Sequence, residues 1–465
     1  MHFLPILTLL LFLAAPAKAA QSSWIVDQAG GGDFTAIQQA IWDANVLDGD
    51  TVIVRDGTYF ENINFWDKAI TIKSEHGPAA TIIDGNQMDS VVTFMSGEGP
   101  GSVLDGFTLT HGWSGWGGGI YCGEWSSPTI INNIITGNIG GSYGGGIYCY
   151  FWSNPTIANN IIANNRCSFH GGGIATYQSG PTIENNRIVN NSSGSGGGGI
   201  YIDRYDSILI RNNIISGNRT ASYGGGILCT LSSTLSIEGC TIINNTADVI
   251  GGGIYMAHST PSIMNTIVWG NSAPSNPEMY DIWGLPLVSY CNVRGGWPGT
   301  GNLNSDPLIV GDVHLSQTAS GQTLNSPCVD TGYPMTSPIG TTRTNGSADV
   351  GVVDMGYHYT TSSVLLSANN LSGGAVATIS MYHNNPGDVC LVGFSVFGGG
   401  SLPSPFGTVF LTPPFTTLPV IIANSQGVAQ TTSWIPLNAS GRSVWLHGFN
   451  RTAGLLTNPL AETIR

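Results

Sequence analysis

Gly171-Gly172-Gly173-Ile174 is one of six copies of the motif that decides the fold of this 465-residue chain. The spacing between successive copies is 27 residues, except for one spacing of 26. The other five copies begin at Gly117, Gly144, Gly197, Gly224 and Gly251. A fixed period of this length is typical of a solenoid, in which each repeat is one coil that buries its apolar side against the neighbouring coils.

The residues between two glycine motifs form short apolar runs bounded by turn residues, such as Ile120-Tyr121-Cys122 and Pro128-Thr129-Ile130-Ile131. Runs of three to five residues rich in β-branched side chains indicate strands rather than helices. A strand rises ~3.3 Å per residue. One repeat therefore predicts a coil of three short strands and three bends, and successive coils stack in parallel. In that arrangement the isoleucine of each motif forms one buried row, made of Ile120, Ile147, Ile174, Ile200, Ile227 and Ile254.

Asparagine recurs at two fixed places in the coil. One column is Asn133, Asn160, Asn186 and Asn213, and the other is Asn138, Asn165, Asn191, Asn218, Asn245 and Asn271. An Asn at a bend can take the left-handed backbone conformation, and its amide can bond to the Asn of the coils above and below. We therefore expect two asparagine ladders. The triple glycines predict a close-packed bend without room for a Cβ.

Gly-Gly-Gly-Ile-Tyr at 117–121, followed by the Asn-Asn run at 132–135 and the closing Asn138, resembles the right-handed parallel β-helix proteins of the pectin lyase-like class. The apolar-x-x-Asn tetrads, such as Ile135 to Asn138, also resemble the repeats of polymorphic outer-membrane adhesins. The first resemblance implies an all-β, right-handed parallel β-helix. The second suggests a surface role.

The beginning of the chain predicts a leader and a cap. Residues 1–20 contain an apolar run, Leu4 to Ala15, with small residues at Ala17 and Ala19, as in a cleaved secretory signal peptide. Residues 21–110 would hold the cap and the first coils, with a helix from Phe34 to Asn45 capped by Asp33. This opening resembles that of pectin methylesterases and other β-helix proteins. The prediction is a secreted or cell-surface protein.

Beyond the regular repeats, assigned to residues 111–289, the pattern changes twice. Residues 290–361 contain Ser326-Pro327-Cys328-Val329-Asp330 and Asp354-Met355-Gly356-Tyr357, and they resemble the terminal module of the choice-of-anchor Q family. That resemblance implies secretion or surface attachment. Residues 362–465 alternate short apolar runs with Gly, Pro and Asn turns, which predicts a small antiparallel β-sandwich.

Composition limits the partners. Only 9% of the residues are charged, and the formal net charge is -14. Such an acidic chain is a poor match for nucleic acid, which needs a basic surface. No segment after the leader is apolar enough to predict a transmembrane span.

The chain has eight cysteines, and their positions relative to the repeats distinguish expected core residues from disulfide candidates. Cys122, Cys149 and Cys229 share one inward place in the coil and are expected as core residues. Cys291 and Cys328 lie outside the repeats and are the disulfide candidates. Histidines and cysteines lack metal-ligand spacing, so neither a metal site nor a cofactor is predicted.

Catalytic candidates are few. A glycosidase needs two carboxylates at a defined separation, and in the coils only Asp203 and Asp206 lie close together in the sequence, with Arg204 between them. Two acids three residues apart are also typical of solvated turns. These three residues define the alternative function, a polysaccharide lyase or glycoside hydrolase.

Aromatic residues form the most distinctive predicted surface. Because strand side chains alternate, the residue after each motif isoleucine should point outward, as should the residue two positions later. The candidates for carbohydrate binding are Tyr121, Tyr148, Tyr150, Tyr177, Tyr201, Trp125 and Trp152. Such rings can stack on sugars, or they can form ladders that stabilise the coils. The favoured hypothesis is a non-catalytic protein that binds extracellular polysaccharide or cell-surface glycan, or acts as an adhesin.

Overall fold

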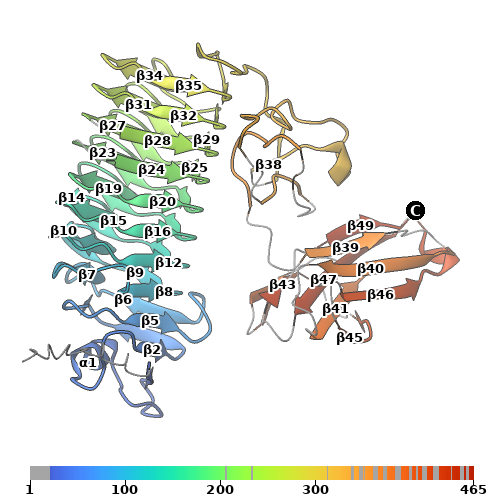
Figure 1. Ribbon diagram of the computed structural model, residues 1–465, viewed down its shortest axis with the longest axis horizontal. Coiled ribbons are helices and arrows are strands. Elements are labelled where there is room, and N and C mark those ends of the chain that lie inside the picture. Colours follow the sequence, from blue (N-terminus) through green and yellow to red (C-terminus); the bar gives the residue numbers. More distant parts are fainter. Residues whose placement is uncertain are drawn as a thin grey trace, which may run out of the picture.

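The computed structural model describes residues 21–464, with gaps at 205–206, 232–233, 312, 337–339, 345–348, 350, 360–364, 370–373, 383–388, 397–400, 405–406, 411–415, 423–428, 441, 451–454 and 457–459. The 1–20 leader predicted from the sequence lies outside the described residues. Figure 1 shows a tall stack of parallel strands that runs from α1 (Ile37–Trp42) to β34 (Met279–Ile282) and β35 (Leu287–Ser289).

Three long parallel sheets make the walls of this β-helix. We call them sheets A, B and C. Sheet A contains β1 (Ser23–Val26), β2 (Thr51–Val54), β5 (Thr71–Ser74), β8 (Val103–Asp105), β12 (Thr129–Ile131), β16 (Thr156–Ala158), β20 (Thr182–Glu184), β24 (Ser207–Arg211), β28 (Thr234–Glu238), β32 (Ser262–Met264) and β35. Sheet B contains β3 (Gly57–Phe60), β6 (Thr81–Asp84), β9 (Thr108–Thr110), β13 (Ile134–Thr136), β17 (Ile161–Ala163), β21 (Arg187–Val189), β25 (Ile214–Ser216), β29 (Thr241–Ile243), β33 (Ile267–Trp269) and β36 (Asn292–Val293). Sheet C contains β4 (Ile63–Asn64), β7 (Val92–Phe94), β11 (Ile120–Cys122), β15 (Ile147–Tyr150), β19 (Ile174–Tyr177), β23 (Ile200–Asp203), β27 (Ile227–Thr230), β31 (Ile254–Ala257) and β34.

The predicted all-β parallel β-helix is confirmed, and so is its register. The motif isoleucines pair with one another from coil to coil, for example Ile147 with Ile174 and Ile174 with Ile200, and all six are fully buried. The glycine bends pack backbone on backbone. A Cβ at Gly172 would lie 2.5 Å from the carbonyl oxygens of both Gly198 and Ser192, which excludes any side chain there.

The central coils differ from the predicted three-strand coil because they carry a fourth, shorter strand. These strands pair into sheet D, which precedes the glycine bends. Its members are β10 (Trp113–Trp116), β14 (Ile139–Tyr143), β18 (Arg166–Cys167), β22 (Ser192–Ser193), β26 (Arg219–Thr220) and β30 (Thr246–Ala247). Most of these strands have only two residues, which is too short to leave a periodic signal in the sequence.

Both asparagine ladders are present and buried. Asn191 shows the arrangement: its Oδ1 accepts from the backbone and side-chain nitrogens of Asn165, and its Nδ2 donates to Ile162 O and Asn218 Oδ1, all at 2.8–3.0 Å. The left-handed backbone belongs to the preceding residue, such as Asn190 at φ 55°, and not to the ladder Asn as expected. The exposed neighbour therefore makes the bend, and the buried Asn satisfies the backbone groups that the bend leaves free.

The two ends of the β-helix are capped by different interactions. At the first end, the α1 helix is shorter than the predicted 34–45, and Asp33 does not cap it. Instead the Glu61 carboxylate accepts from the backbone N–H groups of Ile37 and Gln38 at 2.9 and 2.8 Å. At the other end, the buried Glu278 carboxylate accepts from Asn271 N and Nδ2 and so ends the second ladder. Burial raises the pKa of Glu278.

The chain after the coils returns along the β-helix. This part includes β37 (Ile309–Val310), β38 (His314–Leu315) and η1 (Thr318–Ser320). It docks on the bend between sheets A and B, where His358 N donates to Asn212 Oδ1 and Asn212 Nδ2 donates to His358 O, both at 2.6 Å.

The C-terminal region is antiparallel, as predicted, and its two main sheets share one apolar core that includes Met381, Val392 and Leu446. The first sheet contains β39 (Leu365–Asn369), β40 (Val376–Tyr382) and β46 (Ala429–Trp434). The second contains β41 (Val389–Ser395), β44 (Thr416–Thr417), β45 (Ile421–Ile422), β47 (Ser443–Asn450), β48 (Leu455–Leu456) and β49 (Leu460–Thr463). The remaining elements are a hairpin of β42 (Ser401–Ser404) with β43 (Gly407–Phe410), and η2 (Leu437–Ala439).

The predicted disulfide between Cys291 and Cys328 is wrong, because both are free, buried thiols. Cys291 lies in the column that continues the first asparagine ladder, where its Sγ contacts the carbonyl oxygens of Ile263 and Ser289. Cys328 instead accepts from Asn292 Nδ2 at 3.1 Å. Cys122, Cys149 and Cys229 are buried core residues, as expected.

Candidate functional site

The candidate site is a groove on the outer face of sheet C, beside sheet D. Sheet C presents two outward columns of side chains. We call the first column the floor, which runs through Tyr121, Tyr148, Ala175 and Tyr201 in consecutive coils. The second column, one pleat further along the strand, holds Tyr150, Tyr177 and Asp203. On the other side, Trp116 and Tyr143 project from sheet D.

The structure corrects the predicted exposure of the floor. Tyr148 and Tyr201 are only 4% and 6% exposed, and Ala175 is fully buried. Residues at the end of sheet D cover them: Tyr143 stacks on Tyr148 with ring centroids 5.3 Å apart, and His170 stacks on Tyr201 at 4.4 Å. Tyr148 and Tyr201 therefore act as a ladder that supports the groove, while Tyr121, Tyr150 and Tyr177 remain partly accessible.

Two hollows open along this groove. The first has a volume of about 300 Å³ and is lined by Trp116, Tyr121, Tyr143, Tyr148, Tyr150 and Tyr177. The second has a volume of about 540 Å³ and is lined by Met95, Ser96, Gly97, Glu124, Trp125, Tyr150 and Phe151. Tyr150 lines both hollows, so they adjoin. The second hollow contains residues that the sequence did not single out as a site, namely Met95, Glu124 and Phe151, because they lie in bends with no periodic pattern.

Gly123 lies between Met95 and Tyr150 in register. It occupies the second column in its coil, where other coils carry a side chain. A Cβ at Gly123 would lie 2.4 Å from the Tyr121 hydroxyl, so this hydroxyl occupies the space beside the glycine. The Tyr121 side chain thus takes the place that a side chain at position 123 would fill.

Trp125 and Trp152 stand beside the second hollow as an exposed pair. Their rings are stacked, with centroids 5.8 Å apart and planes 11° apart, and they are 62% and 52% exposed. Phe151 meets Trp125 edge-on at 6.1 Å. All three backbones are left-handed, at φ 71°, 61° and 50° for Trp125, Trp152 and Phe151. Left-handed bulky residues are uncommon and cluster at functional surfaces.

Burial raises the pKa of three tyrosines of the groove. Burial, reinforced by the nearby Glu124 carboxylate, raises the pKa of Tyr121 to about 12. Burial raises the pKa of Tyr148 and of Tyr143 as well. The hydroxyl groups of Tyr121, Tyr143 and Tyr148 are therefore hydrogen-bond donors and acceptors near neutral pH, and none of these three is poised as a base.

The catalytic candidates Asp203 and Arg204 lie at the end of the second column, outside the residues that line the two hollows. Asp203 accepts from Thr230 Oγ1 at 3.0 Å, and Arg204 Nε lies 4.0 Å from its other oxygen. Asp206 lies outside the described residues. In the second column Gly123 lies three coils before Asp203, and Glu124 directly follows Gly123. At ~4.8 Å per strand, three coils place the two carboxylates roughly 14 Å apart. That separation exceeds the roughly 9.5 Å upper limit for glycosidase carboxylate pairs.

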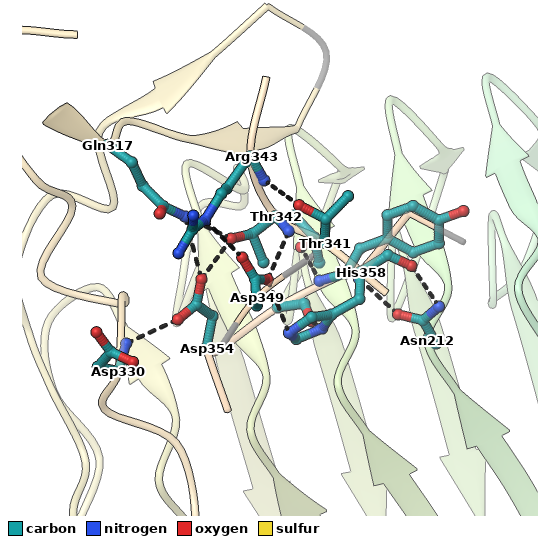
Figure 2. A network of polar contacts seen from close by, with 12 residues as sticks. Asn212, Gln317, Asp330, Thr341, Thr342, Arg343, Asp349, Asp354 and His358 are labelled. Carbon is teal, nitrogen blue, oxygen red and sulfur yellow. Dashed lines mark hydrogen bonds and ion pairs between the residues drawn. The ribbon is translucent and has the colours of Figure 1, made fainter. Parts of the chain in front are cut away.

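The densest cluster of titratable groups lies elsewhere, where the 290–359 segment docks (Figure 2). Asp354 accepts from Asp330 N at 2.7 Å, from Gln317 Nε2 at 3.2 Å and from the Thr342 hydroxyl. Asp349 accepts from Thr342 N and Arg343 Nε at 2.7 and 3.1 Å. Burial raises the pKa of both carboxylates and lowers that of His358. Because Asp354 is only 2% exposed, substrate cannot reach it, and the network is structural.

We expect Asp354→Ala to lower stability by about 2–4 kcal/mol, because it removes the acceptor that Asp330 N, Gln317 Nε2 and the buried Thr342 hydroxyl share. Asp306→Ala is the matched control, since the exposed Asp306 accepts only from Leu308 N. Denaturant unfolding of both variants tests the assignment. Equal stabilities would show that the network does not hold this segment.

Over the part of the chain that the structure describes, no group of three or more His, Cys, Asp or Glu side chains could hold a metal ion. In the same described residues, every helix is too short or too polar to cross a membrane.

The comparisons with known proteins concern the coils. Residues 48–196 and 96–273 match the family model described as a right handed beta helix region. No curated protein and no solved structure matches the chain. The matched residues cover most of the coils that carry sheets A to D, including the whole of the aromatic groove. This region is a right-handed parallel β-helix of repeated coils.

Proposed function

We propose that this right-handed β-helix protein is a secreted or surface-attached, non-catalytic carbohydrate-binding protein, and that the aromatic groove is its binding site. The observation that carries the proposal is the exposed Trp125–Trp152 pair beside two hollows lined by aromatic rings and hydroxyl groups. Sugars offer apolar C–H faces to such rings and hydroxyl groups to the polar rim. The apolar leader and the resemblance of residues 290–359 to the choice-of-anchor Q module support an extracellular location.

A glycan array with the protein lacking residues 1–20, followed by calorimetry on the hits, tests this function. We expect Trp125→Ala and Trp152→Ala each to weaken binding about tenfold or more, because exposed aromatic anchors dominate such contacts. Trp283→Ala is a matched control: Trp283 is 76% exposed, left-handed at φ 60°, and lies in the corresponding bend of a later coil. Binding that is equally weak in all three variants, or no binding at all, would contradict the proposal.

The alternative function is a polysaccharide lyase or hydrolase that uses Asp203, Asp206 and Arg204. It is supported only by the proximity of Asp203 to the groove, where Arg204 Cζ lies 5.3 Å from the centre of the Tyr177 ring. Product-release assays on plant and algal polysaccharides separate the two functions. We expect no turnover by the wild-type protein. Turnover that Asp203→Asn abolishes would establish the enzyme.

A further inference from the structure

We infer that the groove selects an uncharged polysaccharide and excludes polyuronates and sulfated glycans. This inference rests on the proposed function and names the ligand class of the same site. It rests on the charges of the residues that line the two hollows, on the contacts of Arg204 and His170, and on the overall charge of the protein.

The lining of the two hollows is almost free of charge. Among the described residues that line them, Glu124 is the one Asp, Glu, Lys, Arg or His side chain. The others offer aromatic rings, tyrosine hydroxyls, a thioether, a serine hydroxyl and backbone. A carboxylate beside an aromatic platform can accept hydrogen bonds from sugar hydroxyls, and charge-assisted bonds of this kind are strong. It repels the carboxylates or sulfates of an acidic glycan.

Two basic side chains beside the groove, Arg204 and His170, line neither hollow. Arg204 lies over the Tyr177 ring and 4.0 Å from Asp203, so its charge faces an acid of its own coil. His170 is stacked between Tyr143 and Tyr201, and burial lowers its pKa. Recognition of a polyuronate needs cations that face each carboxylate or a metal bridge. The groove provides neither among the described residues that line it.

The whole protein adds to this selection. A formal charge of -14 creates a negative field that slows the approach of any polyanion at low ionic strength. This field does not change the approach of an uncharged glycan. Its binding should therefore depend little on salt, whereas any residual binding of an acidic glycan should increase when salt screens the repulsion.

Calorimetry with two series of polysaccharides tests the inference. The uncharged series contains glucans, mannans, xylans and galactans, and the charged series contains polygalacturonate, alginate and a sulfated galactan. We expect binding only in the uncharged series, with less than about a threefold change in Kd between 50 and 500 mM salt. We also expect Glu124→Lys to make polygalacturonate binding measurable. Glu75→Lys is the matched charge change, because Glu75 follows β5 on sheet A, outside both hollows.

The possible results distinguish a failure of the inferred ligand class from a failure of the carbohydrate-binding function. Wild-type binding to a polyuronate as tight as to any uncharged glycan, and weakened by Trp125→Ala, would overturn the inference and leave the carbohydrate-binding function intact. Enhanced polyuronate binding by Glu75→Lys equal to that of Glu124→Lys would also overturn it, because the overall charge and not the groove would then select the ligand. Binding to neither series would remove the proposed function itself.

Discussion

Replacing Ile174 with aspartate is expected to cost about 4 kcal/mol or more and to unfold the central coils. Ile174 is fully buried in the middle of the isoleucine row, between Ile147 and Ile200. An aspartate there would place an unpaired carboxylate in an apolar core, where neither water nor a cation can reach it. Because each coil is buried only by its neighbours, the damage should spread along the stack. Circular dichroism and denaturant unfolding measure the loss.

Ile161→Asp is the matched control, with the same residue type and the same change one coil earlier. Ile161 is 36% exposed on the outer face of sheet B, and Arg187 is its register neighbour. The new carboxylate would stay hydrated, so we expect a change within about 1 kcal/mol. Similar losses in the two variants would show that the inward and outward faces of the coil are assigned wrongly.

The floor of the groove changes a related expectation. From strand alternation alone, Ala175 should point to solvent and tolerate aspartate. In the structure Ala175 does point away from the core of the β-helix, yet it is fully buried under the aromatic cluster that includes Tyr148 and Tyr201. We therefore expect Ala175→Asp to be nearly as damaging as Ile174→Asp. Alternation predicts which side of a strand a residue faces, but not what covers that side.

This contrast shows which features of the structure can be predicted from the sequence. The 27-residue period is sufficient to predict the parallel β-helix, the isoleucine row and both asparagine ladders, because stacking in register makes identical positions identical in space. It is not sufficient to predict sheet D, whose two-residue strands carry no pattern. Since sheet D and its following residues cover Tyr148 and Tyr201, these two side chains are less exposed than strand alternation predicts.

Interactions between distant residues account for the other differences. The α1 cap is supplied by Glu61, 24 residues away from Ile37, and not by the neighbouring Asp33. The network around Asp354 joins residues that are 12 to 37 positions apart. Local capping rules and cysteine spacing cannot predict such contacts, because the residues are far apart in the sequence.

The asparagine ladder allows a second prediction with a large effect. Asn191→Ala should destabilise the protein by about 4 kcal/mol, because the amide makes four hydrogen bonds and is 1% exposed. Its loss removes the acceptor of Asn165 N and the side-chain donor to Ile162 O, at a cost of about 1–3 kcal/mol for each buried group, and it breaks the side-chain bonds to Asn165 Nδ2 and Asn218 Oδ1.

Asn164→Ala separates this effect from that of the bend itself. Asn164 is exposed and left-handed at φ 55°, and it directly precedes the ladder residue Asn165. Alanine at that position loses only the preference of Asn for the left-handed conformation, which is worth about 1 kcal/mol. Chemical denaturation should therefore rank Asn191→Ala well below Asn164→Ala in stability. If the two were equal, the bend conformation and not the buried amide would be what holds consecutive coils in register.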